Sequence, residues 1–389
     1  MTSTDAHQVI SGRIAAGKLP GAVTLVARGN DVTIDALGVT AFGGEEPMRR
    51  ETIFRLASLT KPVVAAVTMM LVDDGVLALD QPIDTVLPEM AGKQVLRAVD
   101  GPLDDTVPAN RPITLEDLLT YRIGHGMIEQ PTFNPPFPIN QAGWDQNLVL
   151  AEPDPRTPHA PDEWMKLFGA LPLMYQPGER WQYNTGGLLL GVLVARAGGG
   201  TLEEVLIARL FDPLGMPDTR FSLPADRLTG LPRQYMTNFG TGVMEEQTNT
   251  ATPLWTKPPA FPSGSAGLLS TVDDYYSFAR FMKSGTSPSG HRLLSEKSLA
   301  AMTTNHLTAD QIAGGGVILG GRGWGLGQSV TVVPDQISQT PGRYGWEGGY
   351  GTSWFNDPTT GVTAILLTQV SDVLFDGTLT EFGAAANAQ

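Results

Sequence analysis

Ser58 and Lys61 stand three residues apart, a spacing that can join a hydroxyl to an amine. Residues three apart in a helix share a face, so the amine can reach the hydroxyl if a helix begins near Ser58. A serine becomes a nucleophile when another group takes its proton, and a lysine can do so once burial or a neighbouring cation lowers its pKa. The pair therefore predicts acyl-transfer chemistry. A helix cap followed by a surface lysine is the alternative interpretation.

The residues that follow favour the chemical interpretation. The run from 63 to 72 has almost no polar side chain, which indicates a helix buried on all sides. Pro62 is tolerated only near a helix start, and Asp73-Asp74-Gly75 is typical of a helix end. Lys61 then enters an apolar interior, where an unpaired ammonium is costly. The helix start adds N–H groups that can stabilise an oxyanion at Ser58.

Two later stretches carry groups that could complete such a site. They are Pro177-Gly178-Glu179-Arg180-Trp181-Gln182-Tyr183-Asn184-Thr185-Gly186 and Tyr344-Gly345-Trp346-Glu347-Gly348-Gly349-Tyr350-Gly351-Thr352. Tyr183 can be a core residue with a satisfied hydroxyl. If its hydroxyl meets Lys61, its pKa falls and it becomes a candidate general base. The glycines of the second stretch form either a simple turn or a close approach to a substrate, with an N–H aimed at an oxyanion.

Taken in this order and at these separations, the three motifs resemble those of the serine β-lactamase and penicillin-binding-protein superfamily. Within it, the chain is similar to the class C β-lactamase-like branch and especially to the family VIII carboxylesterases. The resemblance implies that Ser58 is the acylated nucleophile, that Lys61 assists its deprotonation, and that Tyr183 is the base and later the acid. It also implies an oxyanion hole formed by the backbone N–H groups of Ser58 and Gly349.

Two departures from the superfamily pattern bear on the substrate. Lactamases carry Tyr-x-Asn, whereas this chain has Tyr183-Asn184-Thr185, so the amide that binds a lactam side chain is replaced by Thr185 or displaced to Asn184. Lactamases carry Lys-Thr-Gly, whereas this chain has Trp346-Glu347-Gly348. A cation that would hold a substrate carboxylate is thereby lost, which does not weaken binding of neutral esters. We predict that Thr185, Trp346 and Gly348 bind the substrate.

The predicted function is cleavage of carboxylic esters with short to medium acyl chains through an acyl-enzyme intermediate. Alternatives in the same superfamily are a β-lactamase, a D-amino-acid peptidase or amidase, and an acyltransferase. A ligand-binding or sensor protein is the alternative from another class, although all three motif positions hold reactive residue types. Aromatic residues of the loops 131–144 and 236–255 either line an apolar pocket or pack the lobe: Phe133, Phe137, Trp144, Tyr235, Phe239 and Trp255.

Two other residues are kept outside the predicted site. Ser265 lies in Ser263-Gly264-Ser265-Ala266-Gly267, which lacks the first glycine of a Gly-x-Ser-x-Gly elbow. His125 lies in a loop, Ile123-Gly124-His125-Gly126, where a histidine is usually structural or solvated. The five histidines form no metal-binding spacing and there is no cysteine, so no metal and no cofactor are expected.

The net charge and the absence of long apolar stretches limit the kinds of molecule that the protein is expected to bind. The net charge of −14 argues against binding to nucleic acid or to an anionic membrane, since both need a basic face. No stretch approaches the length of a membrane span, and the N-terminus lacks a signal segment. We therefore expect a cytoplasmic protein or a trimmed mature form that acts on a small-molecule ester. The sequence does not predict the oligomeric state.

The elements predicted around these motifs indicate an α+β fold of the β-lactamase and transpeptidase type. Hairpins are predicted near both ends, over 22–38 and 353–368, with a Pro-rich and mostly helical stretch between them. We predict one antiparallel sheet flanked by helices, built from 1–78 and 265–389, with a helical lobe of 79–264 inserted and the site in the cleft between. Helices are predicted near 9–17, 114–120, 188–197, 201–210 and 271–282, and a short strand over 324–328.

Overall fold

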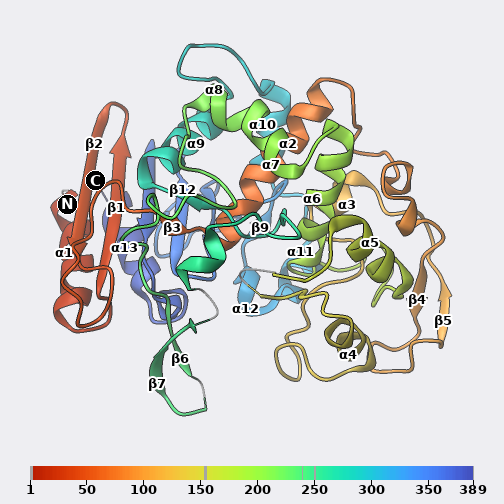
Figure 1. The fold of residues 1–389 in the computed structure, drawn as a ribbon. Helices are drawn as coiled ribbons and strands as arrows, with labels where there is room; N and C mark the ends of the chain where they lie inside the picture. The colour runs from red at the N-terminus through yellow and green to blue at the C-terminus, as the bar shows by residue number, and fades with distance from the viewer. Residues whose placement is uncertain (1–2, 153–155, 239, 249–250, 389) are drawn as a thin grey trace.

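The computed structural model describes residues 3–152, 156–238, 240–248 and 251–388, so Phe239 lies outside the described residues. Its centre is a seven-stranded antiparallel sheet of order β2-β1-β13-β12-β11-β10-β9. The strands are β1 (Gly21–Arg28), β2 (Asp31–Gly38), β9 (Gly323–Trp324), β10 (Ser329–Val330), β11 (Tyr344–Gly348), β12 (Thr352–Asn356) and β13 (Val362–Leu367). Two strands from the start of the chain thus join five from its end, which Figure 1 shows as red strands beside blue ones.

The side-chain alternation of β1 explains why the sheet has a core on each face. Val23 and Leu25 belong to the main hydrophobic core, whereas Ala22 and Val26 belong to a second, smaller core. Successive residues of a strand point to opposite faces, so an uninterrupted apolar strand buries both. Helices α1 (Ser3–Ala15) and α13 (Thr378–Asn387) pack together over the smaller core, and α9 (Val272–Ser284) packs against the same sheet.

The remaining elements lie mainly in the helical region on the right of Figure 1. The other α-helices are α2 (Thr60–Asp73), α3 (Leu115–Leu119), α4 (Pro138–Asp145), α5 (Pro161–Ala170), α6 (Thr185–Gly198), α7 (Leu202–Leu206), α8 (Asp212–Leu214), α10 (Glu296–Met302), α11 (Ala309–Gly314) and α12 (Gly316–Leu319). Short helical turns are η1 (Ala57–Leu59), η2 (Ile83–Thr85), η3 (Pro88–Met90), η4 (Ile207–Phe211), η6 (Thr252–Trp255) and η7 (Ser371–Leu374). Small strand pairs are β3 (Phe54–Arg55) with β8 (Leu269–Ser270), β4 (Gln94–Leu96) with β5 (Thr106–Pro108), and β6 (Tyr235–Asn238) with β7 (Val243–Glu246).

Helices α2 and α6 pack against each other in the middle of the molecule. Every residue of α2 from Thr60 to Leu71 is buried, and so is every residue of α6 from Thr185 to Val194. A helix that is apolar all round is stable only inside a core, so these two segments cannot lie at the surface. Their first turns lie at the same end, which brings together two motifs more than a hundred residues apart.

The predicted fold class is confirmed, and the N- and C-terminal hairpins form as expected. The expected strand over 324–328 is wrong. Only Trp324 of that stretch is in β9, because Gly325 bonds back to Gln328 and Gly327 has a positive φ of 87°, which makes a tight turn into β10. Parts of the two expected loops are ordered elements, α4 in the first and the β6–β7 hairpin in the second. The boundaries drawn at 79 and 265 stay a prediction.

Among the described residues, no single helix is long and apolar enough to cross a membrane. Helix α6 and the segment Leu202–Leu214 pass that test only as a pair, with a bend of 73° between them. The first ten residues of α6 are buried inside the protein.

Candidate active site

Ser58 is positioned by the segment that leads into α2. Strand β3 pairs with β8, and the next residue, Leu56, donates its N–H to the carbonyl of Leu268 at 2.8 Å. The hydroxyl of Thr352 donates to the carbonyl of Leu56 at 2.9 Å, which ties this segment to β12. Ala57 then takes a positive φ of 47°, a conformation that non-glycine residues rarely adopt and that tends to occur at functional sites. Ser58 is thus held at the start of the η1–α2 helical segment.

Lys61 points into the interior, as the sequence predicts. Its side chain is 1% exposed, and its amine lies 2.9 Å from Ser58 Oγ, 2.8 Å from Asn184 Oδ1 and 2.8 Å from the carbonyl oxygen of Ser265. Burial lowers the pKa of Lys61 well below its ordinary value, because the charged ammonium loses its hydration.

The neutral form of the Lys61 amine can satisfy all three of its partners, as an ammonium can. Two of them, Asn184 Oδ1 and the Ser265 carbonyl, can only accept hydrogen bonds, whereas the Ser58 hydroxyl can also donate. A neutral amine has two N–H groups for the two obligate acceptors and one lone pair for the Ser58 proton. The geometry therefore allows Ser58 to point its proton at a basic nitrogen.

Tyr183 meets Ser58 rather than Lys61. Its hydroxyl accepts the indole N–H of Trp346 at 2.7 Å, and it lies near enough to Ser58 for that residue to lower its pKa. The Lys61 amine lies 4.5 Å from the centre of the Tyr183 ring, over its face. Burial raises the pKa of Tyr183, and its hydrogen bonds to Ser58 and Trp346 only partly offset that effect. The condition for a lowered pKa, a contact between the Tyr183 hydroxyl and the Lys61 amine, is not met, because that amine bonds to Ser58, Asn184 and Ser265.

Asn184 fixes the Lys61 amine from the other side. Its φ of 82° turns the chain sharply just before α6, and its side-chain amide donates to the Leu150 carbonyl at 2.6 Å, which leaves Oδ1 facing Lys61. The hydroxyl of Ser265 is fully buried and donates to the Asn184 carbonyl at 2.7 Å. Ser265 thus supports the turn and is not a nucleophile, as its incomplete motif already indicated.

Thr185 does not bind substrate in this geometry. Its side chain is 1% exposed, and its hydroxyl lies 3.3 Å from Nδ1 of His125, which is equally buried. The sharp turn at Asn184 directs the amide of that residue to the site and places Thr185 in the first turn of α6. Of the two sequence alternatives, the displaced amide at Asn184 is the one that reaches Lys61. Burial lowers the pKa of His125 to about 3, so it is a neutral interior residue.

The glycines after Trp346 have two different uses. A side chain at Gly348 would overlap the carbonyl oxygen of Leu56, so this glycine lets β11 approach the Ser58 segment. Gly348 is not among the described residues that line the cavity, and its role in substrate binding stays a prediction. Gly349 follows in the turn closed by the Gly351 N–H on the Gly348 carbonyl at 2.9 Å, and it lines the same cavity as Ser58. The oxyanion hole of Ser58 and Gly349 stays a prediction.

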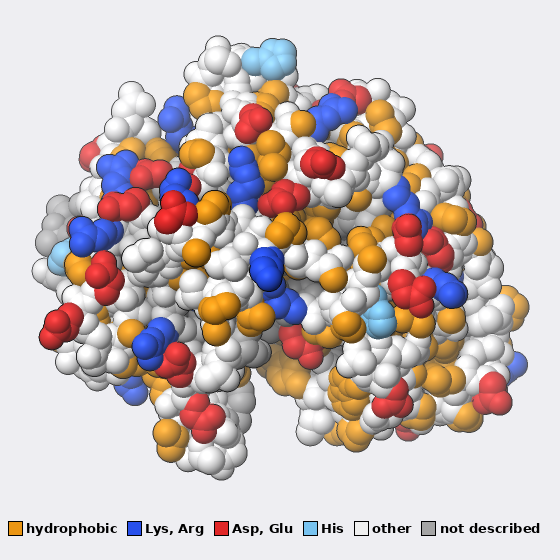
Figure 2. Space-filling model, in the orientation of Figure 1, with side chains coloured by type: hydrophobic (Ala, Val, Ile, Leu, Met, Phe, Trp, Pro, Cys, Tyr) orange, Lys and Arg blue, Asp and Glu red, His pale blue; other side chains and the backbone are white. Residues whose placement is uncertain are grey.

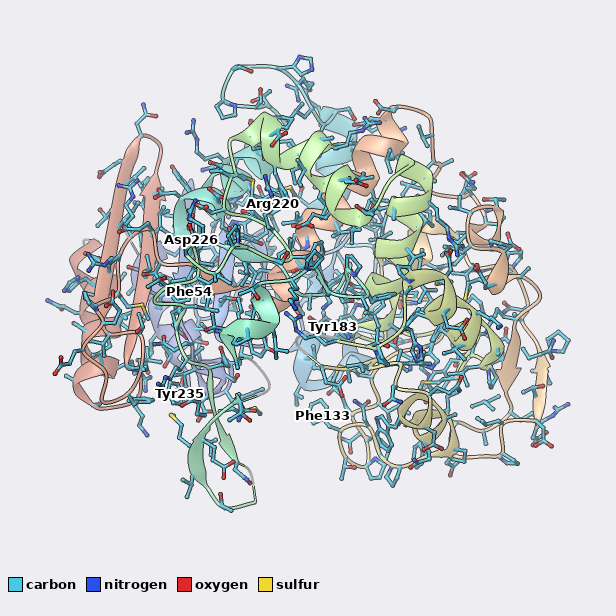
Figure 3. All side chains as sticks on the ribbon, in the orientation of Figure 1. Phe54, Phe133, Tyr183, Arg220, Asp226 and Tyr235 are labelled. Carbon is cyan, nitrogen blue, oxygen red and sulfur yellow. The ribbon has the colours of Figure 1, made fainter. Side chains whose placement is uncertain are left out.

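A cavity of about 480 Å³ opens onto Ser58. Its walls come from five parts of the chain: Ser58; Met127 and Phe133; Ala151, Glu152, Tyr183 and Asn184; Val317, Ile318, Gly320, Arg322, Asp335, Ile337, Arg343, Trp346, Glu347 and Gly349; and Leu374, Phe375, Leu379 and Thr380. Figure 2 shows hydrophobic side chains along a notch in the lower edge of this face. In Figure 3, Tyr183 lies between the sheet and the helical region, with Phe133 below it.

Of the described loop aromatics predicted for the pocket, Phe133 lines the cavity, and Phe137, Trp144, Tyr235 and Trp255 do not. Trp255 is fully buried in a separate small core, and Tyr235 packs edge-on against Phe42. For these two residues the alternative is correct, namely that they pack the surrounding structure.

Comparison with known proteins identifies the family. The profile of the Beta-lactamase family matches residues 6–386. The chain belongs to the Beta-lactamase family. It is 36% identical over 369 residues to Protein Rv1367c of Mycobacterium tuberculosis, covering 91% of this chain and 86% of that one. It is 30% identical over 381 residues to the esterase EstB of Burkholderia gladioli, covering 93% and 89%.

Solved structures agree on the fold of this Beta-lactamase family member. EstCE1, described as a hydrolase with promiscuous acyltransferase activity, aligns with a TM-score of 0.80 at 23% identity, over 99% of this chain and 98% of that one. This likeness confirms the β-lactamase and transpeptidase type of fold predicted from the three motifs. The family and its esterase member support hydrolase activity for the chain.

Arg322 is the cavity residue that sequence reasoning missed in this family member. It donates to Glu347 Oε1 at 2.5 Å, and its guanidinium lies 4.9 Å from the centre of the Trp346 ring. No local pattern points to it, because it reaches the Trp346-Glu347-Gly348 strand from the segment before β9. In the part of the chain that the structure describes, no cluster of three or more His, Asp or Glu could hold a metal ion.

Proposed function

We propose that this Beta-lactamase family member is a serine esterase that cleaves neutral carboxylic esters through an acyl-enzyme. The observation that carries the proposal is the hydroxyl of Ser58, which lies 2.9 Å from a buried amine and shares the wall of an open cavity with the phenol of Tyr183. A nucleophile, a base and an acid within hydrogen-bond reach are what acyl transfer needs.

In the first step, Ser58 Oγ attacks the ester carbonyl carbon and its proton passes to the neutral amine of Lys61. Burial lowers the pKa of Lys61 well below its ordinary value, which favours the neutral amine that a general base requires. Tyr183 is unsuited to that role, because its raised pKa keeps the phenol protonated. We therefore assign the base to Lys61, where the resemblance alone assigned it to Tyr183.

In the second step, the carbon–oxygen bond to the alcohol breaks and the alkoxide takes the phenolic proton of Tyr183. This step leaves Tyr183 as a phenolate and Lys61 as an ammonium. The indole N–H of Trp346 can only donate, so its bond to the Tyr183 oxygen leaves the phenolic O–H free to point at the reacting atoms. Water then attacks the acyl carbon and gives a proton to the Tyr183 phenolate. The bond to the Ser58 oxygen breaks, that oxygen takes the proton of Lys61, and the acid leaves.

The preference for neutral esters is supported by what stands in place of a lysine. Trp346 presents an apolar ring and a donor already used by Tyr183, so it offers no cation to a substrate carboxylate. The Arg322 guanidinium beside it is paired with Glu347. The relative EstB, 30% identical over most of both chains, is named an esterase.

The test is hydrolysis of p-nitrophenyl butanoate by the wild type and by Ser58→Ala. We expect the variant to lose at least about 10³-fold in kcat, since no other group replaces the nucleophile. Ser287→Ala, a buried serine bonded to Ser289, is the matched control and is expected to keep wild-type kinetics. Full activity in Ser58→Ala would end the proposal.

A parallel assay with nitrocefin compares kcat/KM for an ester with kcat/KM for a β-lactam. We expect kcat/KM for the butanoate ester to exceed that for nitrocefin, because nitrocefin carries a carboxylate that finds no free cation in the cavity as described. A strong preference for nitrocefin would replace the esterase proposal with a β-lactamase.

A further inference from the structure

The cavity wall beside Tyr183 contains a cation whose charge is already neutralised. Arg322 and Glu347 both line the cavity, and their side chains are 21% and 27% exposed. Their contact of 2.5 Å joins Arg322 Nη1 to one carboxylate oxygen of Glu347. Because the pair is only partly buried, a ligand and water can reach its outer atoms.

The position of Arg322 does not depend on Glu347 alone. Its Nε donates to the carbonyl of Leu319 at 3.1 Å and its Nη2 to the carbonyl of Ile318 at 3.3 Å. Its plane lies over the indole of Trp346, 4.9 Å from the ring centre. Two backbone carbonyls and an aromatic face therefore hold the guanidinium in place even without the carboxylate.

The pair lies on the leaving-group side of the proposed reaction. Trp346 connects it to the phenol of Tyr183, which gives its proton to the departing alcohol. The charges of Glu347 and Arg322 act on that phenol with opposite signs, Glu347 raising its pKa and Arg322 lowering it. Both charges are therefore within electrostatic range of the reacting atoms.

We propose that Glu347 determines substrate choice by occupying Arg322, so that esters of neutral alcohols are taken and esters of carboxylate-bearing alcohols are rejected. This inference rests on the proposed function, since it concerns the alcohol part of the same ester. A guanidinium binds a carboxylate through charge-assisted N–H groups, and the Nη1 group of Arg322 already donates to the carboxylate of Glu347. A second carboxylate there would meet a neutralised cation and a like charge.

It follows that Glu347→Gln should allow the Arg322 guanidinium, which the fold already keeps in place, to bind a substrate carboxylate. Glutamine keeps the size of the side chain and an acceptor for Arg322, but it removes the negative charge. The substrates are phenyl butanoate and 3-carboxyphenyl butanoate, which give the same acyl-enzyme and differ only in the leaving alcohol. The measured quantity is the ratio of kcat/KM for the carboxylated ester to kcat/KM for the neutral one.

We expect Glu347→Gln to raise this ratio about tenfold over the wild type, the effect of one charged hydrogen bond reduced by contact with water. Glu152→Gln removes the same charge from another segment of the cavity wall, where the carboxylate accepts the Ala151 N–H, and should leave the ratio unchanged. Arg322→Met should lower the ratio below the wild-type value, and adding it to Glu347→Gln should cancel the gain.

Binding of the product 3-hydroxybenzoate, measured by calorimetry against phenol, gives a second readout that needs no turnover. We expect Glu347→Gln to bind it about tenfold more tightly than the wild type. An unchanged ratio and unchanged binding in a folded Glu347→Gln protein would overturn the inference, as would an equal gain in Glu152→Gln. If no variant hydrolyses any ester, the proposed function fails, and the binding result still decides the role of Glu347.

Discussion

The cavity has two parts that differ in structure: a floor formed around Ser58 and Lys61, and a rim formed by Phe133, Val317 and Phe375. At the floor, Ser58 and Lys61 are nearly inaccessible, and each side-chain polar atom of Lys61 and Asn184 has a hydrogen-bond partner. At the rim, Phe375 and Val317 are each 70% exposed and Phe133 is 52% exposed, although large apolar side chains are usually buried. They come from loops and short helices far apart in the chain.

This difference separates what fixes the reaction from what selects the substrate. Buried polar groups at the floor are costly unless they are all satisfied, so a change there affects the whole network. Exposed rim residues make few packing contacts within the protein. Substituting them should therefore change contacts with the substrate and have little effect on stability. Substitutions at the floor should therefore act on kcat, and substitutions at the rim on KM.

The largest effect is expected at Lys61. Lys61→Met removes the proposed base and should lower kcat for p-nitrophenyl butanoate by about 10³-fold or more. Lys93 is the matched control, since it is also buried and donates to the carbonyls of Gly169 and Leu171. Lys93→Met should change stability and leave kcat near the wild-type value. Equal losses in both variants would show that a buried lysine matters only for folding.

Tyr183→Phe should lower kcat by about 10²- to 10³-fold, because the leaving alcohol loses its proton donor. Tyr344, whose buried hydroxyl donates to the Met282 carbonyl at 2.7 Å, provides the control. Tyr344→Phe should cost about 1 kcal/mol of stability and leave kcat unaffected. A leaving group of low pKa, such as p-nitrophenol, should suffer less from Tyr183→Phe than phenol does. The reverse order would contradict the role of Tyr183 as acid.

The buried amine should also make stability depend on pH. The pKa of Lys61 is lowered in the folded protein, so between that pKa and its ordinary value of 10.5 the unfolded chain binds more protons. The stability of the wild type relative to Lys61→Met should therefore rise with pH in this window, by up to about 1.4 kcal/mol per pH unit. Urea unfolding of both proteins at several pH values measures it. A difference independent of pH would mean that Lys61 stays charged in the fold.

The smallest effect is expected at the rim. Phe375→Ala should raise KM for p-nitrophenyl octanoate a few-fold and leave kcat and the acetate ester unchanged, because only a long acyl chain reaches the rim. Phe42→Ala removes an aromatic ring that is 37% exposed and lies outside the cavity, and it should change neither constant. A fall in kcat for both esters in Phe375→Ala would show that the rim and the floor are coupled.

Sequence alone predicted the residues whose surroundings are local. Ser58 and Lys61 share one helical turn, and the apolar run after Pro62 already showed that the amine must be buried. The strands near both ends carry enough β-branched residues and turn glycines to predict their hairpins, although not the partners of each strand. Tyr183 was predictable as a member of the site from the motif that contains it.

The remaining features of the site depend on contacts that no spacing encodes. The choice between Thr185 and Asn184 depends on the positive φ of Asn184, which is stabilised by Ser265 and Leu150 from other segments. The raised pKa of Tyr183 results mainly from its burial, which the tertiary fold creates. Arg322 reaches Trp346 and Glu347 from the segment before β9, so a residue outside the motif places a cation beside it, and Glu347 neutralises that cation.

The most direct test of the account is intact-mass measurement and peptide mapping after rapid quenching of the protein with p-nitrophenyl butanoate. We predict a transient gain of one butanoyl group on Ser58 in the wild type and no adduct in Ser58→Ala. Turnover without any adduct on Ser58, or an adduct on another residue, would contradict the central claim that Ser58 is the nucleophile.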